Sequence, residues 1–127
     1  METVLIVEDY VVTQEMFAHV MEVAGFKTIS FDNGDDALEY LKTETDLPKV
    51  MLLDINLPGV SGVQLVQYLR HTLNRYDIKV IMLTANVVAR ENLDPYLADE
   101  IMTKPVSVNI LKKEVQRLMS EYKPPAK

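Results

Sequence analysis

Residues 50–62 read Val50-Met51-Leu52-Leu53-Asp54-Ile55-Asn56-Leu57-Pro58-Gly59-Val60-Ser61-Gly62, an apolar run that ends abruptly at an acid. Four consecutive apolar residues are typical of a strand that is buried on both faces of a parallel sheet. Pro58 and the two glycines predict that a loop follows, so Asp54 stands at the carboxyl end of the strand. In open α/β sheets, ligands bind at that end. Taken alone, this stretch leaves two interpretations of Asp54 open, a chemical role and a cap of the following turn.

Four other short segments read as strands, over residues 3–7, 27–31, 79–83 and 101–103. Apolar residues at helical spacing follow the strands and predict helices. In chain order these residues are Val12, Met16, Phe17, Val20 and Ala24; Ala37, Leu38 and Leu41; Val63, Leu65, Val66 and Leu69; and Leu111, Val115, Leu118 and Met119. A further helix is predicted from about residue 87 to residue 94, just before Pro95.

Five alternations of strand and helix predict an α/β fold, (βα)5, in which a parallel sheet carries helices on both faces. We predict the flavodoxin-like form, a doubly wound parallel five-stranded sheet with strand order 2-1-3-4-5. In that order the first and third strands are neighbours, which brings Glu8 and Asp9 beside Asp54. The predicted domain covers residues 1–121, and we expect residues 122–127, which include two prolines, to form a disordered tail.

The composition narrows the classes of function. The chain has 127 residues, which is enough for one well-buried domain. Its formal net charge of −6 argues against direct binding to nucleic acid and favours cations or basic partner surfaces. The absence of cysteine excludes disulfides, thiolate chemistry and cysteine-ligated zinc.

No part of the sequence has the character of a membrane segment. No apolar run approaches the roughly 20 residues that span a bilayer. The first residues lack the basic and apolar regions of a signal peptide. We therefore expect a cytoplasmic protein that does not insert into a membrane.

Five polar residues follow the ends of predicted strands and should meet at one edge of the sheet: Glu8, Asp9, Asp54, Thr84 and Lys104. Three crowded carboxylates repel one another, because a pair of like charges about 4 Å apart costs roughly 4 kcal/mol at an effective dielectric of 20. A single lysine offsets only part of that repulsion. Hard oxygen ligands suit Mg²⁺, so the cluster predicts a magnesium site.

The same arrangement suits Asp54 as a nucleophile, since an aspartate carboxylate needs no partner base at neutral pH. A metal ion and Lys104 would neutralise an incoming phosphoryl group, and the Thr84 hydroxyl would donate a hydrogen bond to its oxygens. The chemistry that these residues imply is phosphoryl transfer to Asp54, which produces an acyl phosphate.

The sequence resembles the receiver domains of bacterial two-component response regulators, of the kind found in the chemotaxis regulator. Four motifs carry the resemblance: Val7-Glu8-Asp9, Asp54-x-x-x-Pro58-Gly59-x-x-Gly62, Thr84-Ala85 and Lys104-Pro105. Each motif alone is weakly specific. Together, in this order and on these elements, they are highly specific, and the resemblance covers residues 4 to about 120.

The resemblance implies a phosphoacceptor with a metal site. Asp54 would be the phosphoacceptor and, with Asp9, would bind Mg²⁺ through side-chain oxygens. The backbone carbonyl of Asn56 would complete the protein ligands, and Glu8 would act through water.

The resemblance also implies contacts to the phosphoryl group and a class of donor. Thr84 and Lys104 would contact the phosphoryl group, and the Lys104-Pro105 bond would be cis. The donor would be a phosphohistidine on a sensor histidine kinase or a histidine phosphotransfer protein. The protein would act as a signalling switch that catalyses only its own phosphorylation and dephosphorylation, and would not be an enzyme in the usual sense.

Two departures from the family pattern concern the output face. Ile101 stands where the family usually has Tyr or Phe, and we expect it to stay buried and not to act as a moving switch. The interval from Thr84 to Lys104 is about two residues short, and Pro95 falls where the fourth helix would end.

Two other functions stay open at this point. A phosphorylation-independent pseudo-receiver would keep the fold as an interaction scaffold, and Ile101 favours it. The second is an aspartate-nucleophile phosphohydrolase that is similar to the haloacid dehalogenase type. Those enzymes carry an Asp-x-Asp motif, but this chain has Asn56 at the position of the second acid.

Overall fold

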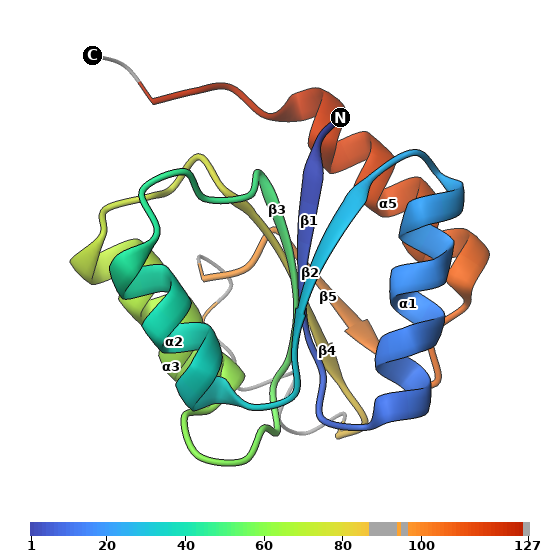
Figure 1. Cartoon of the computed structure of the whole chain (residues 1–127), viewed down its shortest axis with the longest axis horizontal. Helices are drawn as coiled ribbons and strands as arrows, with labels where there is room; N and C mark the ends of the chain where they lie inside the picture. The colour runs from blue at the N-terminus through green and yellow to red at the C-terminus, as the bar shows by residue number, and fades with distance from the viewer. Residues whose placement is uncertain (87–93, 95–96, 126–127) are drawn as a thin grey trace.

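The computed structural model describes residues 1–86, 94 and 97–125, and its centre is a parallel five-stranded sheet between two layers of helices (Figure 1). The strands run in the order β2-β1-β3-β4-β5, and every pair of neighbours is parallel. The strands are β1 (Thr3–Val7), β2 (Lys27–Phe31), β3 (Val50–Asp54), β4 (Lys79–Thr84) and β5 (Glu100–Thr103). The predicted fold class and strand order are confirmed.

The helices cover both faces of the sheet, as Figure 1 shows: α1 and α5 on one side, α2 and α3 on the other. Their bounds are Val11–Val23 for α1, Gly34–Thr43 for α2, Gly62–Gln67 for α3 and Val108–Glu121 for α5. A π-helical turn, η1 (Tyr68–Thr72), continues α3. The helix predicted over residues 87–94 lies outside the described residues except for Asp94.

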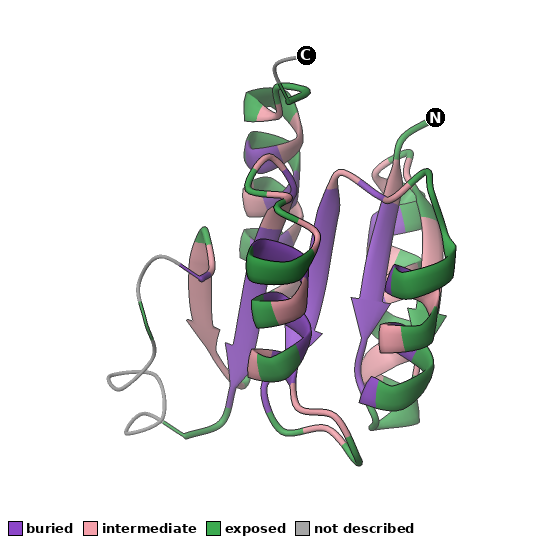
Figure 2. Cartoon of the chain, turned by 90° about the vertical axis from the view of Figure 1, so that its left-hand side faces the viewer, coloured by how far each residue is buried: buried purple, intermediate pink, exposed green. Residues whose placement is uncertain are grey.

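Alternate residues of each central strand enter different halves of the core, as the two-residue period of a strand requires. Leu5, Met51 and Val80 pack under α2 and α3, whereas Ile6, Leu52 and Ile81 pack under α1 and α5. Figure 2 shows the central strands buried and the edge strand β5 only half-buried. No helix among the described residues has the length and apolar character needed to cross a bilayer.

The apolar face of α1 differs from the one that the sequence spacing predicts. Phe17 and Met21 are buried, but Val12 is 63% exposed and Met16 is 43% exposed. At about 100° per residue, Val12 and Met16 lie roughly 140° and 100° around the helix from Phe17, so they face away from the sheet. The spacing predicted the helix and the packing of Phe17 and Val20 correctly, and it was wrong about Val12 and Met16.

At the end of the sheet opposite Asp54, three side chains join the α3–β4 connection to the chain after α5. Arg75 donates two hydrogen bonds to Asp77, at 2.9 and 3.0 Å, and the Tyr122 hydroxyl donates a third at 2.9 Å. Burial alone would raise the pKa of Asp77, but these hydrogen bonds hold it below its ordinary value. Tyr122 is the first residue of the predicted tail, and the domain boundary at residue 121 stays a prediction.

We expect Asp77→Asn to lower the free energy of unfolding at neutral pH by about 1–3 kcal/mol, the usual worth of hydrogen bonds to a charged group. Because the pKa of Asp77 is lower in the folded state, its contribution is present above the unfolded pKa and is lost as pH falls through the folded pKa. Urea unfolding of both proteins from neutral to acid pH should therefore converge at the acid end. A constant difference across that range would contradict this account.

Candidate functional site

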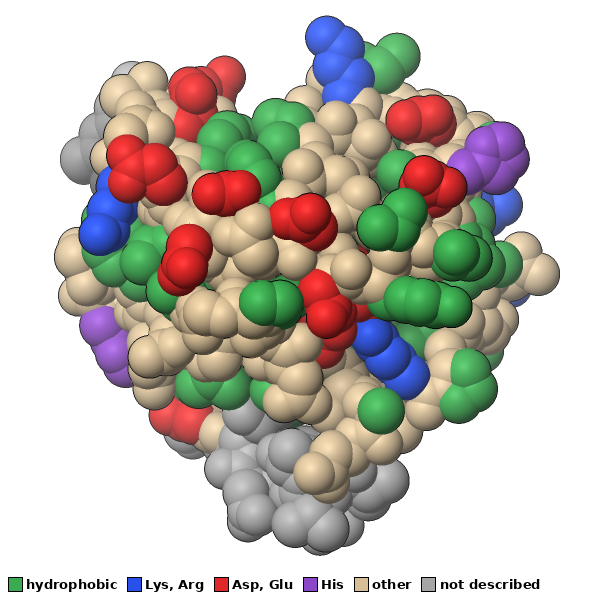
Figure 3. Space-filling view, turned by 60° about the horizontal axis from the view of Figure 1, so that its bottom comes forward, with side chains coloured by type: hydrophobic (Ala, Val, Ile, Leu, Met, Phe, Trp, Pro, Cys, Tyr) green, Lys and Arg blue, Asp and Glu red, His purple; other side chains and the backbone are tan. Residues whose placement is uncertain are grey.

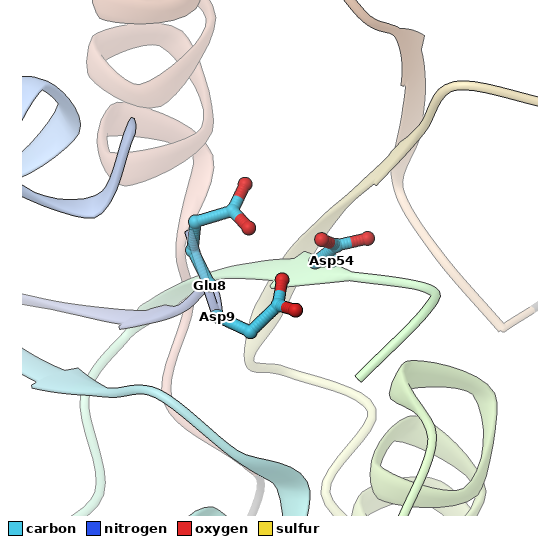
Figure 4. Close-up of side chains that lie close together, drawn as sticks. All are labelled: Glu8, Asp9 and Asp54. Atoms are coloured by element: carbon cyan, nitrogen blue, oxygen red, sulfur yellow. The ribbon is translucent and has the colours of Figure 1, made fainter. Parts of the chain in front are cut away.

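Three carboxyl groups meet where β1 and β3 end, and Figure 4 shows them pointing toward one another. One oxygen from each of Glu8, Asp9 and Asp54 lies within 4.8 Å of the others. The strand register explains the meeting, because Val7 pairs with Leu53 and the next residue on each strand is an acid. The structure thus brings together the three acids on which the sequence-based magnesium site depends.

The three acids differ in their access to water. Glu8 is 1% exposed and Asp54 is 5% exposed, whereas Asp9 is an exposed residue. Two carboxyl groups are therefore desolvated beside a third that opens to solvent. A ligand would reach the buried pair from the side of Asp9.

Lys104 lies between the two buried acids. Its Nζ is 2.5 Å from Glu8 Oε1 and 3.0 Å from Asp54 Oδ2. Burial would lower the pKa of Lys104, but its hydrogen bonds to Glu8 and Asp54 outweigh burial and raise it. One ammonium group therefore contacts two of the three clustered carboxyl groups, which leaves negative charge uncompensated.

The position of Lys104 is set by the end of β5. Its backbone N–H donates to the carbonyl of Thr84 at 2.7 Å, one step beyond the ladder pair Thr84–Thr103. The Lys104–Pro105 peptide bond is cis, as the family resemblance implies.

The crowding acts on Glu8 in particular. Burial raises the pKa of Glu8, the hydrogen bond from Lys104 lowers it only in part, and the neighbouring Asp54 raises it further. The net direction is upward, so folding disfavours the ionised form of this carboxyl group. A cation that binds here would relieve that cost.

The loop after Asp54 is fixed against two helices. The Asn56 N–H donates to Asp54 Oδ1 at 3.0 Å, so this hydrogen bond holds the Asp54 carboxyl group and the loop together. A Cβ on Gly62 would lie 2.2 Å from the Asp54 carbonyl oxygen, and one on Gly34 would lie 1.7 Å from that of Val60. Glycine at both places lets α3 and α2 close onto the loop that carries the Asn56 carbonyl.

Thr84 lies in the same region, but its hydroxyl is used within its own turn. The residue is fully buried at the end of β4, beside β3. Its Oγ1 accepts from the Asn86 N–H at 3.0 Å and donates to the Asn86 carbonyl at 3.4 Å. A contact of Thr84 with a bound group stays a prediction.

Sequence reasoning missed Gln14, which ties the site to the neighbouring strand. Its Nε2 donates to the carbonyl of Glu8 at 3.1 Å and to that of Phe31 at 2.9 Å. The sole sequence signal is an amide in the first turns of the helix. The cap of α3 was more visible, because Ser61 and Gln64 form a capping box of the S-x-x-Q type.

The donor set fits a hard divalent cation. All the ligand atoms on offer are carboxylate or carbonyl oxygens, and the excess of negative charge calls for a cation. Mg²⁺ usually takes one or two carboxylates and keeps several waters, which suits a cluster in which Asp9 is open to solvent.

Comparison with known proteins agrees with this geometry. The family model described as "Response regulator receiver domain" matches residues 4–116. The phosphate regulon transcriptional regulatory protein PhoB of Escherichia coli (strain K12) is 33% identical over 125 residues, which are 97% of this chain and 54% of PhoB. The chain therefore spans about half the length of that relative. The polar-differentiation response regulator DivK of Brucella anthropi is 31% identical over 109 residues, or 84% of this chain and 87% of DivK.

Solved structures share the fold. The response regulator protein TrrA of Thermotoga maritima, in complex with Mg²⁺-BeF, has a TM-score of 0.82 at 29% identity, over 93% of this chain and 99% of TrrA. The signal receiver domain of a histidine kinase from Syntrophus aciditrophicus has a TM-score of 0.85 at 29% identity, over 99% of this chain and 96% of that domain.

We expect Glu8→Gln to raise the free energy of unfolding at neutral pH in EDTA, because burial and the neighbouring Asp54 disfavour the ionised carboxyl group and the amide carries no charge. A folded pKa above the ordinary 4.5 means that wild-type stability falls as pH rises from that value through the folded pKa. The variant should lack this fall, which chemical denaturation at several pH values would measure. Glu15→Gln, at an exposed position on α1, is the matched control. A Glu8→Gln protein less stable than wild type in EDTA would contradict the argument.

Proposed function

The chain belongs to the family of response regulator receiver domains, and we propose that it accepts a phosphoryl group on Asp54 as a switch in a two-component phosphorelay. The observation that carries the proposal is the position of Asp54, 3.0 Å from Lys104 and in reach of the carboxyl oxygens of Glu8 and Asp9. Receiver domains are signalling domains and not conventional enzymes. They are phosphorylated by histidine kinases.

The proposed transfer is a displacement at phosphorus. A carboxylate oxygen of Asp54 attacks the phosphorus of a phosphohistidine, a new O–P bond forms, and the P–N bond breaks. The electron pair of that bond stays on the imidazole nitrogen of the donor, which takes up a proton. Lys104, which already donates a hydrogen bond to Asp54, is placed to balance negative charge on the phosphoryl oxygens.

Mg²⁺ is the proposed cofactor, held by Asp9, Asp54 and the Asn56 carbonyl, with Glu8 acting through water. When bound, it would supply positive charge that offsets both the acids and the incoming phosphoryl group. The excess of carboxyl groups over lysine in the site supports this assignment, and so does the Mg²⁺-BeF complex of the neighbour TrrA.

Thr84 is proposed to bind a phosphoryl oxygen after a local exchange of partners. Its hydroxyl now donates to the Asn86 carbonyl, so contact with the phosphoryl group requires that hydrogen bond to break. The exchange would link phosphorylation to the turn after β4. Ile101 packs against the core but is only half-buried, so the full burial expected from the sequence is not found. That it does not serve as a moving switch stays a prediction.

An apolar surface beside the acids is the proposed docking site for the phosphohistidine donor. Tyr10, Val11 and Val12 are 65%, 55% and 63% exposed, directly after Asp9 in the chain. Figure 3 shows hydrophobic side chains gathered beside the acidic ones on this face. A cavity of about 390 Å³ adjoins them between α1 and the β5–α5 connection, lined in part by Met16 and Pro105. An amphipathic helix that carries the donor histidine fits such a surface.

The alternative functions receive less support. A phosphohydrolase would need a second acid where Asn56 stands, and Asp54 ends the third strand, not the first. PhoB is named a transcriptional regulatory protein, but this chain spans only about half of PhoB. The net charge of −6 of this chain also argues against contact with DNA.

The cytoplasmic location stays a prediction.

We expect the wild-type protein to gain one phosphoryl group from acetyl phosphate with Mg²⁺, seen as a single mass addition in intact-protein mass spectrometry. Asp54→Asn should abolish the addition, and EDTA should suppress it. Lys104→Ala should slow it by about a hundredfold, the scale of losing one charge-stabilising group. A wild-type protein that stays unmodified would favour the pseudo-receiver scaffold, and phosphate released steadily from small phosphoesters would favour the hydrolase.

We expect Val12→Asp to weaken transfer from a phosphorylated histidine phosphotransfer domain by about tenfold in KM, because an interface contact is lost and a charge enters an apolar surface. Transfer from acetyl phosphate should not change. Val23→Asp is the matched control, since Val23 is 70% exposed at the other end of α1. Equal losses from both donors, or from both variants, would remove this surface from the proposal.

A further inference from the structure

Arg70 is a buried charged residue that the proposed reaction does not use. Among the described residues, those that are polar and buried as a whole, backbone included, are Glu8, Asp54, Thr84 and Arg70. The first three belong to the site at the carboxyl ends of the strands. Arg70, only 3% exposed, lies in η1 and reaches the amino ends of β4 and β5.

The Arg70 guanidinium joins two segments of the chain that are far apart in sequence. Nε donates to the Leu97 carbonyl at 3.1 Å, and Nη1 donates to the carbonyls of Arg75 and Ile78 at 2.8 and 2.6 Å. Nη2 donates to Asp99 Oδ2 at 3.2 Å. The acceptors come from the chain before β4 and the chain before β5, so one side chain fixes the two strand starts relative to each other.

Asp99 completes the connection through two hydrogen bonds with the backbone of Val80. The Asp99 N–H donates to the Val80 carbonyl at 2.9 Å, and the Val80 N–H donates to Asp99 Oδ2 at 2.8 Å. Arg70 binds that same Oδ2 and holds it in place. Asp99 is thereby set opposite Val80, one step before the first ladder pair, Ile81–Glu100.

This connection matters because the register of β5 is weakly specified by burial. β5 is a four-residue strand at the sheet edge, and all four of its residues are half-buried. Register is set strongly where one face of a strand is buried, and a slip of one residue turns every side chain to the other face. Such a slip would put Thr103 or Pro105 at the place from which Lys104 reaches Glu8 and Asp54.

We propose that Arg70 is a positioning residue for Lys104: with Asp99, it fixes the register of β5 and so holds the Lys104 ammonium at Asp54. The inference rests on the proposed phosphoacceptor function of Asp54. Arginine suits the role because its planar fork offers several donors in fixed directions, and these serve four acceptors at once. A lysine would keep the charge but could not serve all four.

The test is a double-mutant cycle on the rate of phosphorylation by acetyl phosphate with Mg²⁺, using Arg70→Lys and Lys104→Ala. We expect Arg70→Lys to slow the wild-type reaction by about tenfold, the effect of a misplaced catalytic group. In the Lys104→Ala background it should slow the reaction no further, because the two changes act through one group. Equal slowing in both backgrounds, or none in the first, would overturn the proposal.

Arg75→Lys is the matched control, because Arg75 lies in the same connection but its side chain pairs with Asp77, in the chain before β4. It should alter stability without altering the rate. If Arg70→Lys does not fold, Asp99→Asn takes its place in the same cycle, since it keeps the shape of the side chain and removes its charge.

Hydrogen exchange at the Lys104 amide gives a second measurement that needs no phosphorylation. This amide donates to the Thr84 carbonyl, and we expect Arg70→Lys to speed its exchange more than Arg75→Lys does at matched stability. Equal exchange in the two variants would count against the proposal. A wild-type protein that accepts no phosphoryl group, with the exchange difference present, would refute the proposed function and leave the placement of Lys104 by Arg70 supported.

Discussion

Electrostatic crowding at the ends of β1 and β3 is the constraint on which the rest of this structure depends. Glu8 and Asp54 are buried beside Asp9, and Lys104 supplies a positive charge at 2.5 and 3.0 Å. Buried carboxyl groups are costly unless they are paired, so folding here keeps a cost that a bound cation would relieve. A site of this kind therefore favours a bound cation.

The fold keeps this unfavourable arrangement in place by fixing each element that contributes to it. Gln14 ties the end of β1 to the end of β2, and the close approach of Gly62 to the Asp54 backbone brings α3 against the end of β3. Arg70 and Asp99 set β5 against β4 at the far end of the sheet, and Lys104 follows from that register. The site is thus maintained by contacts that lie mostly outside it.

The sequence predicted the strands and the polar residues at their carboxyl ends, because an apolar run that stops at an acid indicates both a buried strand and the place where it ends. It could not predict which rows of α1 face the sheet, since spacing fixes a helix but not its rotation, and Val12 and Met16 proved exposed. The sequence did not predict the buried position of Arg70, because an arginine in a helical pattern is usually a surface residue. Its side chain is buried against the chain that precedes β5. The pairing of the Thr84 hydroxyl with Asn86 was equally invisible, because it is a matter of one side-chain rotamer.

The most direct measurement of the central claim is the free energy of unfolding with and without millimolar Mg²⁺, in wild type and in Asp9→Asn. The account predicts that Mg²⁺ stabilises the wild type by RT ln(1 + [Mg²⁺]/Kd), because the cation binds the folded site. It predicts that Asp9→Asn is more stable than wild type in EDTA and gains nothing from Mg²⁺, since one repelling carboxylate and one ligand are removed together. Unchanged wild-type stability between EDTA and Mg²⁺ would contradict it.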